Sequence, residues 1–575
     1  MKLLIRFLST ALFVTTITTL TTYSSQDCPA ENDCACCGST FYLPRPQGSN
    51  SAYFNSYSYD RNRCCAEVDS NYTIGFRFNQ TFNGKNIANC VLGSNALTFV
   101  GFGDYQYSVD QSVPRGSQFI RADDFGLSPF YKGTITFNPR IRNYNVDFSG
   151  RWELGSLDDC LEHFFVGVNA TLTHTCWEWR HECYKTAPSN LVLAPNLLTL
   201  AIDIMFPLGE MSEYRNFDGF KSIPEALQAE RGFGGDGFST YGILGPMRYG
   251  RFILDRPAKA TALANVDAIV GYDFSRCDCS HFSVFLRTSA PTGTQIYSKT
   301  ILEPIIGNGH HWELGGGIDA RGDLWQCDNA SLTAYLTGNL THLFRDGQTR
   351  IIPLVQGCCL SQYSLLKEYD KNGLLIPGIV RGTDVAARQV KSSFALQGDA
   401  TLGFVYRNCD WAFNTGLNIF GRSREKLEDV RPTVDLDKRV FGIKGRTPVF
   451  AQIPAQVGLY IASTSSTYCI TDSNNANTPI DGTPTPVVNS TDWYTGDPAL
   501  QATPTYLNLA TICKMHGVPR MVTYKLFGAI DYQHKDGDRR PFMGIGGEVE
   551  FGSNRNCKVC AANQWGIWTR VGLGF

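Results

Sequence analysis

Hydrophobic and polar residues alternate along much of this chain with a period of two. The last stretch is the clearest, because Trp565, Ile567, Val571, Leu573 and Phe575 fall on one face while mostly Gly, Gln and Arg fall on the other. Successive side chains of a β-strand point to opposite faces, so this pattern predicts a closing strand with one apolar and one polar side. Whether such a strand belongs to a soluble sheet or to a membrane protein depends on how often the pattern recurs.

The same alternation recurs in four pairs of strands joined by short turns. The first pair covers residues 144–154 and 164–172, and each strand has the ~9 to 11 residues that a tilted strand needs to cross a bilayer. Every turn holds a cysteine beside or near an aspartate, which indicates one class of turn on one side of a sheet. The other pairs are 266–274 with 282–286, 312–320 with 332–340, and 394–406 with 411–419, and the turn cysteines are Cys160, Cys277 with Cys279, Cys327 and Cys409.

Seven further stretches and the closing strand bring the expected total to about sixteen strands. The predicted fold is therefore all-β: a single transmembrane antiparallel β-barrel with short periplasmic turns and long extracellular loops. Eighteen strands are the alternative, because residues 198–206 also alternate and the total must stay even; residues 223–231 suggest a short helix. A soluble β-sandwich is disfavoured, because one of this length usually divides into domains. The seven stretches are 72–82, 96–107, 132–137, 439–450, 456–463, 521–533 and 542–551.

Strand direction must alternate, so the side on which Phe575 lies determines the side of every turn. A barrel strand that ends in an aromatic residue is what the barrel-assembly machinery of Gram-negative bacteria recognises, which makes Phe575 the expected assembly signal and puts it on the periplasmic side. The count then places all four cysteine turns in the periplasm. It places four long connections outside the cell, as in outer-membrane barrels: 175–264, 289–309, 345–392 and 464–520.

The sequence of the N-terminal region indicates that the protein is exported from the cytoplasm. Residues 1–25 contain Lys2 and Arg6, then an apolar run, then small residues, which is the pattern of a cleaved signal peptide. No later stretch reaches about 18 uninterrupted apolar residues, so a membrane-spanning helix is not expected. The chain should therefore cross the outer membrane as β-strands, whose outer faces contact the lipid. We expect a cysteine-rich periplasmic segment at 26–70 and the barrel at 71–575.

Twenty cysteines on an exported chain predict disulfides. Several stand in adjacent pairs, and adjacent cysteines rarely bond to each other, so bonds within the chain and bonds between chains are both open. His174, Cys176, His181 and Cys183 have a spacing that zinc could use, but a disulfide between the two cysteines is favoured and no metal is expected. The disulfide candidates are Cys28, Cys34, Cys36, Cys37, Cys64, Cys65, Cys176, Cys183, Cys358, Cys359, Cys557 and Cys560.

Charge and histidine content argue against two other classes of protein. The formal net charge is −2 at pH 7, so nucleic acid is not an expected partner. The nine histidines form no nucleophile motif with a serine and an acid, so neither an enzyme nor a cofactor is expected.

A barrel of sixteen to eighteen strands would enclose a lumen too wide for side chains to fill, so water would occupy it. Its inward faces carry both signs of charge, which suits passive diffusion of small hydrophilic solutes, with selectivity set at the narrowest point. Residues 232–250 could fold inward as that constriction or form an external loop. The expected pore-lining residues are Arg77, Arg151, Glu153, Arg287, His311, Glu313, Asp319, Arg321, Asp399, Arg407, Lys525, Asp531, Glu548 and Arg570, and Asp147, His163, Asp267 and Asp273 share these faces.

The signal peptide, the cysteine-crowded start, the cysteine turns and the terminal Phe575 strand together resemble the cysteine-rich major outer-membrane porins of intracellular bacteria, of the chlamydial and legionella-like kinds. The resemblance covers the whole chain but includes no single diagnostic motif. It implies a general porin that forms homo-oligomers, in particular trimers, with disulfides to other chains and envelope proteins that stiffen the envelope. A structural or adhesin surface protein without significant channel activity is the alternative.

Overall fold

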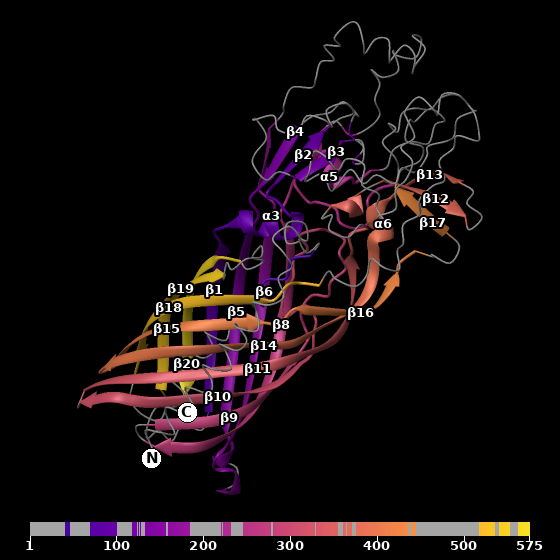
Figure 1. Cartoon of the computed structure of the whole chain (residues 1–575). Coiled ribbons are helices and arrows are strands. Elements are labelled where there is room, and N and C mark those ends of the chain that lie inside the picture. The colour runs from indigo at the N-terminus through magenta and orange to yellow at the C-terminus, as the bar shows by residue number, and fades with distance from the viewer. Residues whose placement is uncertain are drawn as a thin grey trace, which may run out of the picture.

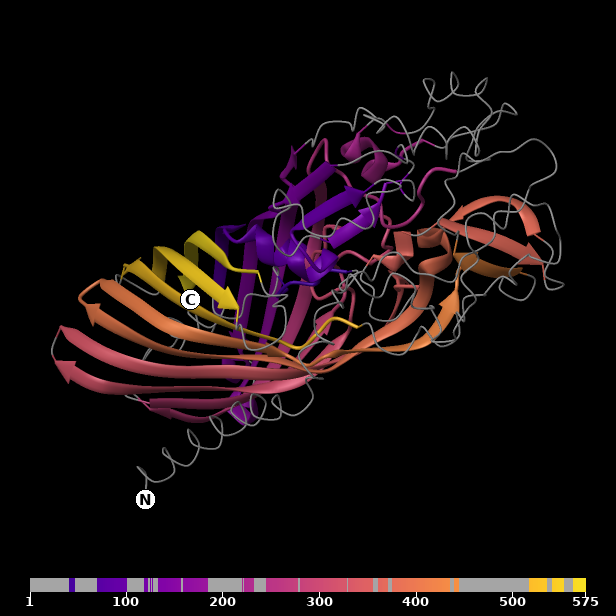
Figure 2. The same cartoon turned by 45° about the horizontal axis from the view of Figure 1, so that its top comes forward.

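The chain forms a β-barrel with a folded region beyond one end, as the computed structural model shows (Figure 1). In a view turned by 45°, strands β11 and β14 extend past the barrel toward that region (Figure 2). The structure describes residues 41–46, 70–100, 118–122, 125, 127, 133–156, 159–184, 220, 222–231, 245–277, 280–327, 329–354, 360–363, 365–370, 375–434, 439–443, 517–534, 540–552 and 562–574.

The barrel is a closed ring of twelve antiparallel strands. Consecutive strands of its sheet are hydrogen-bonded in the order β11-β10-β9-β8-β6-β5-β1-β20-β19-β18-β15-β14, and the pairing of β11 with β14 closes the ring. One extra strand, β16 (Glu425–Pro432), pairs with the part of β14 that extends beyond the barrel. The twelve strands are β1 (Ser70–Thr81), β5 (Arg140–Glu153), β6 (Phe164–Glu178), β8 (Ala258–Cys277), β9 (Ser280–Ala290), β10 (Glu313–Cys327), β11 (Ala330–Ile351), β14 (Ala387–Asn408), β15 (Trp411–Arg422), β18 (Met521–Gln533), β19 (Arg540–Gly552) and β20 (Gln564–Gly574).

Outward side chains of the barrel are mainly apolar, and inward side chains are mainly polar. Leu286 and Ile545 on the outside are 66% and 59% exposed, whereas Arg287 and Asp531 on the inside are buried. This is the reverse of a soluble protein, so the sandwich alternative is wrong and the outer surface faces lipid. Aromatic side chains lie near both ends of that surface, as in barrels that meet two membrane interfaces: Phe164, Phe274 and Trp411 at one end, and Phe82, Trp312 and Phe344 at the other.

The short turns of the barrel lie at one end, which we call the turn end. Strand β20 ends there at Gly574, opposite the start of β1; Phe575 lies outside the described residues. The longer connections lie at the opposite end, the loop end, as the alternation of strand direction requires. In outer-membrane barrels the short turns face the periplasm, so the loop end faces outward. The predicted cysteine turns are at the turn end, with Cys160, Cys277, Cys327 and Cys409.

The prediction of sixteen strands, or eighteen, is wrong. Twelve of the sixteen stretches are barrel strands, three others form short strands outside the barrel, and 456–463 lies outside the described residues, as does 198–206. The three short strands have 5 residues each, too few to cross a bilayer, which takes ~9 to 11. They are β2 (Ala96–Val100) and β4 (Gly133–Phe137) in one small sheet, and β17 (Arg439–Ile443) in another.

Two small sheets and three short helices form the described part of the region at the loop end. The sheets have the orders β3-β2-β4-β7 and β13-β12-β17. The helix expected at 223–231 appears as α5 (Ile223–Gln228), where the side chain of Ser222 accepts a hydrogen bond from the N–H of Glu225. In the described parts of the chain, no helix is long and apolar enough to cross a membrane. The other elements of this region are β3 (Gln118–Arg121), β7 (His181–Tyr184), β12 (Leu365–Asp370), β13 (Leu375–Arg381), α3 (Gly84–Leu92), α6 (Gly382–Ala386) and the 3-10 helix η6 (Ser361–Tyr363). Two further 3-10 helices, η3 (Leu154–Ser156) and η4 (Asp159–Leu161), lie in the turn between β5 and β6 at the turn end.

The core of this outer region is rich in aromatic residues and continues into the barrel. Phe137 stacks on Phe252 with 5.8 Å between ring centroids. Leu343 of β11 and Phe394 of β14, which face inward near the loop end, belong to the same cluster of buried residues. The loop end of the lumen is therefore continuous with an apolar core.

Replacing Ile545 by Lys should lower the free energy of unfolding in lipid vesicles by about 2 to 4 kcal/mol, because a charge on the lipid face near mid-membrane loses its hydration. Ile545→Leu keeps an apolar side chain and should change it by less than about 1.5 kcal/mol. Urea unfolding of the refolded barrel, followed by tryptophan fluorescence, measures both. Equal losses in the two variants would contradict the lipid-facing position of this residue.

Candidate functional site

The residues assigned to the lumen lie, with two exceptions, on the inward faces of the barrel strands. His311 precedes β10 at the loop end, where its ring hydrogen-bonds the carbonyl of Phe344 and burial lowers its pKa. His163 is exposed in the turn before β6. The inward residues are Arg77, Asp147, Arg151, Glu153, Asp267, Asp273, Arg287, Glu313, Asp319, Arg321, Asp399, Arg407, Lys525, Asp531, Glu548 and Arg570.

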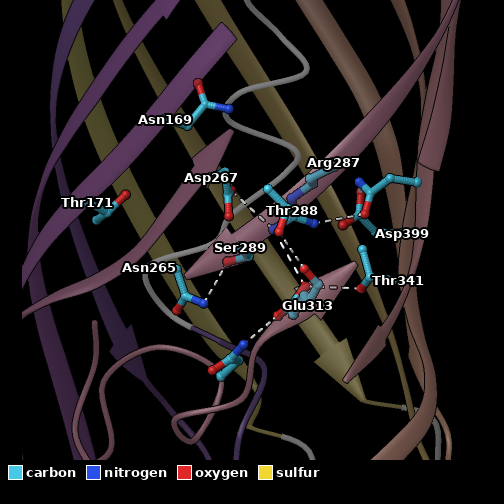
Figure 3. A network of polar contacts seen from close by, with 12 residues as sticks. Asn169, Thr171, Asn265, Asp267, Arg287, Thr288, Ser289, Glu313, Thr341 and Asp399 are labelled. Atoms are coloured by element: carbon cyan, nitrogen blue, oxygen red, sulfur yellow. Dashed lines mark hydrogen bonds and ion pairs between the residues drawn. The ribbon is translucent and has the colours of Figure 1, made fainter. Parts of the chain in front are cut away.

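Arg287 of β9 is the centre of one polar network on the lumen wall (Figure 3). Its guanidinium contacts Asp267 of β8 at 3.1 Å, Glu313 of β10 at 3.8 Å and Asn339 of β11 at 3.0 Å. The hydroxyl of Thr341 donates a hydrogen bond to Glu313 at 3.0 Å. One cation thus connects four neighbouring strands, and two carboxylates share it.

A second cluster lies nearer the turn end. Arg151 of β5 contacts Glu153 at 2.6 Å and Asp273 of β8 at 3.1 Å, and its guanidinium lies 3.4 Å from the centre of the Phe165 ring. His281 bonds the same Asp273 at 3.0 Å. Charged groups are therefore paired across strands at more than one depth of the lumen, which is how buried charges offset their loss of hydration.

One ion pair crosses a strand at a glycine. Arg570 of β20 makes two contacts with Asp531 of β18, at 2.7 and 2.6 Å. Gly544 of β19 lies directly between them in the register of the sheet. A Cβ atom at 544 would lie 1.8 Å from the Oδ1 of Asp531. Only glycine leaves room for this pair.

A similar crossing joins Asn79 of β1 to Glu548 of β19. Asn79 donates to Glu548 at 2.7 Å across Gly566 of β20, where a Cβ atom would lie 2.1 Å from the Asn79 amide nitrogen. Glu548 also pairs with Lys525 of β18 at 3.0 Å. These contacts lie on the side of the ring opposite the Arg287 network. Sequence reasoning missed Asn79 and both glycines, because it considered only charged residues on the inward faces.

Part of the inward surface is apolar. Tyr335, Phe527 and Trp568 belong to one buried cluster on the wall between β11 and β20. Aromatic rings here lie against glycines of neighbouring strands: a Cβ atom at Gly403 would meet the Tyr335 ring at 2.2 Å, and one at Gly546 would meet the Trp568 ring at 2.4 Å. Rings held against the wall project less into the lumen. None of these aromatic residues was identified from the sequence, because a period of two carries no signal that inward rings would cluster.

Residues 41–46, which we call the mouth segment, lie at the loop end of the lumen and are buried throughout. Arg422 at the end of β15 donates hydrogen bonds to the carbonyl oxygens of Leu43 at 2.7 Å and Pro44 at 3.4 Å. The sequence predicted a periplasmic location for 26–70, and these six residues lie instead at the loop end. No pattern in the sequence indicated their position, because the segment is short and does not alternate.

The constriction considered at 232–250 is only partly within the described residues. The N–H of Met247 donates to the carbonyl of Ala229, and the N–H of Gly250 donates to the carbonyl of Ser298. Residues 245–250 therefore pack in the outer region and not on the lumen wall, and the others lie outside the described residues.

The predicted disulfide between Cys176 and Cys183 is wrong. Both are thiols. The sulfur of Cys176 lies 3.4 Å from a ring nitrogen of His174 at the end of β6, whereas Cys183 lies in β7, which pairs with β4 in a different sheet. Cys90 of α3 is disulfide-bonded. In the part of the chain that the structure describes, no group of three or more His, Cys, Asp or Glu could hold a metal. The other disulfide candidates lie outside that part: Cys28, Cys34, Cys36, Cys37, Cys64, Cys65, Cys358, Cys359, Cys557 and Cys560.

Among known proteins, this chain is similar to solved structures of β-barrels, and the similarity is low. No protein family and no curated protein matches the sequence. An outer membrane channel of Pseudomonas putida F1 has 7% identity and a TM-score of 0.30, over 89% of this chain and 98% of that one. A Pseudomonas aeruginosa FadL homologue has 8% identity and a TM-score of 0.25, over 95% and 97%. The translocator domain of the autotransporter NalP from Neisseria meningitidis has 4% identity and a TM-score of 0.24, over 91% and 94%. Similarity at this level carries no argument about function.

The geometry of the barrel places this chain in the bacterial outer membrane. Its sheet is closed and antiparallel, its outside is apolar and its inside polar. Short turns lie at one end and long connections at the other. These are the features of barrels in that membrane.

Gly544→Ala should lower the free energy of unfolding by about 3 kcal/mol, because the added Cβ displaces the Asp531 carboxylate from buried Arg570. Gly421→Ala in β15 is the matched control, since a Cβ there meets nothing within 4 Å. It should leave stability unchanged or raise it by up to about 1 kcal/mol. Urea unfolding in vesicles compares the two variants, and similar values for both would show that the crossing pair contributes nothing.

Proposed function

We propose that this barrel is an outer-membrane channel through which small hydrophilic solutes diffuse passively. The observation that supports the proposal is the polar wall of the lumen, which has paired charges from Arg151 near the turn end to Arg287 further along. Hydrated ions and sugars can exchange hydrogen bonds with such groups. An apolar solute would instead desolvate them without replacing those bonds, which is unfavourable.

The number of strands supports a narrow passage. Eight strands leave an interior that side chains just fill, and sixteen to eighteen leave an open aqueous channel. A ring of twelve lies between these cases, so long side chains such as Arg287 would limit the size of the solute. The wide lumen expected from sixteen strands is replaced by a path defined by these side chains.

A structural or adhesin role without significant channel activity is the second candidate. The observation that favours it is the burial of the wall residues, since Asp273 and Glu313 are 0% and 1% exposed. The folded region beyond the loop end, with its two small sheets, also lies on the side of the barrel that faces the cell exterior. Trimer formation and disulfides to other envelope proteins remain predictions of the resemblance.

Purified, refolded protein should produce discrete ion-conducting events in planar bilayers and should let small sugars swell liposomes. A hydrocarbon-uptake assay in the same vesicles should show no facilitation, because the wall is charged. Empty vesicles and heat-unfolded protein are the controls. A folded barrel that never conducts, whether as wild type or with the mouth segment altered as described below, would leave the structural role as the better interpretation.

Arg287→Gln should make the channel more selective for cations by a few-fold, because Asp267 and Glu313 lose the cation that they share. Arg287→Lys keeps the charge and should stay near the wild-type selectivity. Reversal potentials in a salt gradient measure the ratio of cation to anion permeability. No difference between the two variants would place the conducting path away from this network.

A further inference from the structure

The mouth segment touches four strands spaced around the loop end of the barrel, so it crosses the lumen instead of lining one side. Phe41 lies beside Arg350 of β11, with 3.4 Å between the guanidinium carbon and the ring centre. Arg45 contacts Glu550 of β19 at 3.5 Å. The remaining contacts join Tyr42 to Trp177 of β6, with ring centres 5.9 Å apart, and Leu43 and Pro44 to Arg422 of β15.

Several inward side chains around this segment are apolar, and they lie among charged ones such as Arg350, Arg422 and Glu550. Phe41, Tyr42 and Leu43 belong to the same buried cluster as the inward residues at the loop end. An apolar constriction excludes water and ions, and an apolar peptide seated in it removes the remaining space. We call four of these inward residues, together with Phe420, the apolar collar. Phe420 lies in a separate small cluster, with the Arg45 guanidinium 4.9 Å from its ring centre. The other four are Ile141, Trp177, Leu343 and Phe394.

The mouth segment is not part of the barrel sheet. It belongs to no strand and to none of the strand pairings of the described residues. The hydroxyl of Tyr42 is buried and makes no hydrogen bond within those residues, which weakens the seated position. The segment can therefore leave the collar without breaking the backbone hydrogen bonds that hold the barrel closed.

Two of the three wall charges that the segment contacts, Arg350 and Glu550, have partners of their own. The third, Arg422, would lose its hydrogen bonds to Leu43 and Pro44 and keep its contact with the Phe394 ring at 4.9 Å. Arg350 contacts Glu425 of β16 at 2.7 Å. Burial alone would raise the pKa of Glu425, but the nearby Arg350 and several hydrogen bonds hold that pKa below its usual value, so the carboxylate is ionised. Glu550 accepts hydrogen bonds from Thr523 and Gln564, both at 2.6 Å. Departure of the mouth segment would therefore leave neither Arg350 nor Glu550 isolated.

We propose that the mouth segment is a plug, which closes the loop end of the lumen and must leave the apolar collar before a solute can pass. The proposal rests on the channel function proposed above and adds its regulation. The seated conformation is the closed state, and wild-type channels should conduct only in the fraction of time when the plug is displaced.

The test is a full-length chain in which Phe41→Ser, Tyr42→Ser and Leu43→Ser are combined. All barrel strands are unchanged, so folding should be preserved, and the heat-dependent gel mobility of the barrel checks it. The closed-to-open ratio in planar bilayers should fall by about tenfold or more, since the apolar contacts with the collar are lost. Swelling of liposomes by small sugars should rise in parallel. Tyr297→Ser, an exposed aromatic residue of the outer region, is the control and should behave as wild type.

Arg45→Gln is the second variant, because it removes the contact with Glu550 and lies outside the barrel wall. It should lower the closed-to-open ratio by about tenfold, as expected for the loss of one charged hydrogen bond. If wild type conducts as much as both variants, the plug is refuted while the channel stands. If folded wild type and both variants all fail to conduct, both the channel and its plug are refuted.

Discussion

In a lipid bilayer every backbone polar group must find its hydrogen bond within the protein, and the whole structure depends on this constraint. A sheet satisfies it only by closing, which the pairing of β11 with β14 achieves. Closure gives each strand one face toward lipid and one toward the lumen. Apolar residues such as Ile545 then lie outside, and charged residues such as Asp531 are confined to a space in which they must pair.

The need to pair charges inside the lumen explains why some positions of the barrel accept only one type of residue. Arg570 and Asp531 lie two strands apart and meet only because Gly544 between them has no side chain. Arg287 instead serves two carboxylates on the strands beside it. The paired charges of the wall therefore have two roles. They offset the cost of burying charge inside the barrel, and they would offer hydrogen bonds to a hydrophilic solute.

Beyond the loop end the constraint of the bilayer no longer acts. Short strands, small helices and an apolar core of ordinary type appear there, and the core extends into the barrel as the apolar collar. The mouth segment is seated where these two environments meet. The backbone of the mouth segment is held by side chains such as Arg422 and not by strand pairing. The lumen can therefore open or close while the ring of barrel strands stays closed.

Alternation is a local property of a strand, so the sequence alone was enough to predict an all-β barrel and the inward position of residues such as Arg287 and Asp267. The twelve barrel strands are all among the sixteen stretches that it predicted, but the number of strands was wrong. The sequence could not separate β2, β4 and β17 from barrel strands, since their short apolar stretches suit a water-surrounded core as well as a membrane. The partner of each charge and the place of the mouth segment followed only from the arrangement of the folded chain. Arg45 and Glu550 are 505 positions apart, and contacts at that separation depend on how the ring closes, which no local pattern records.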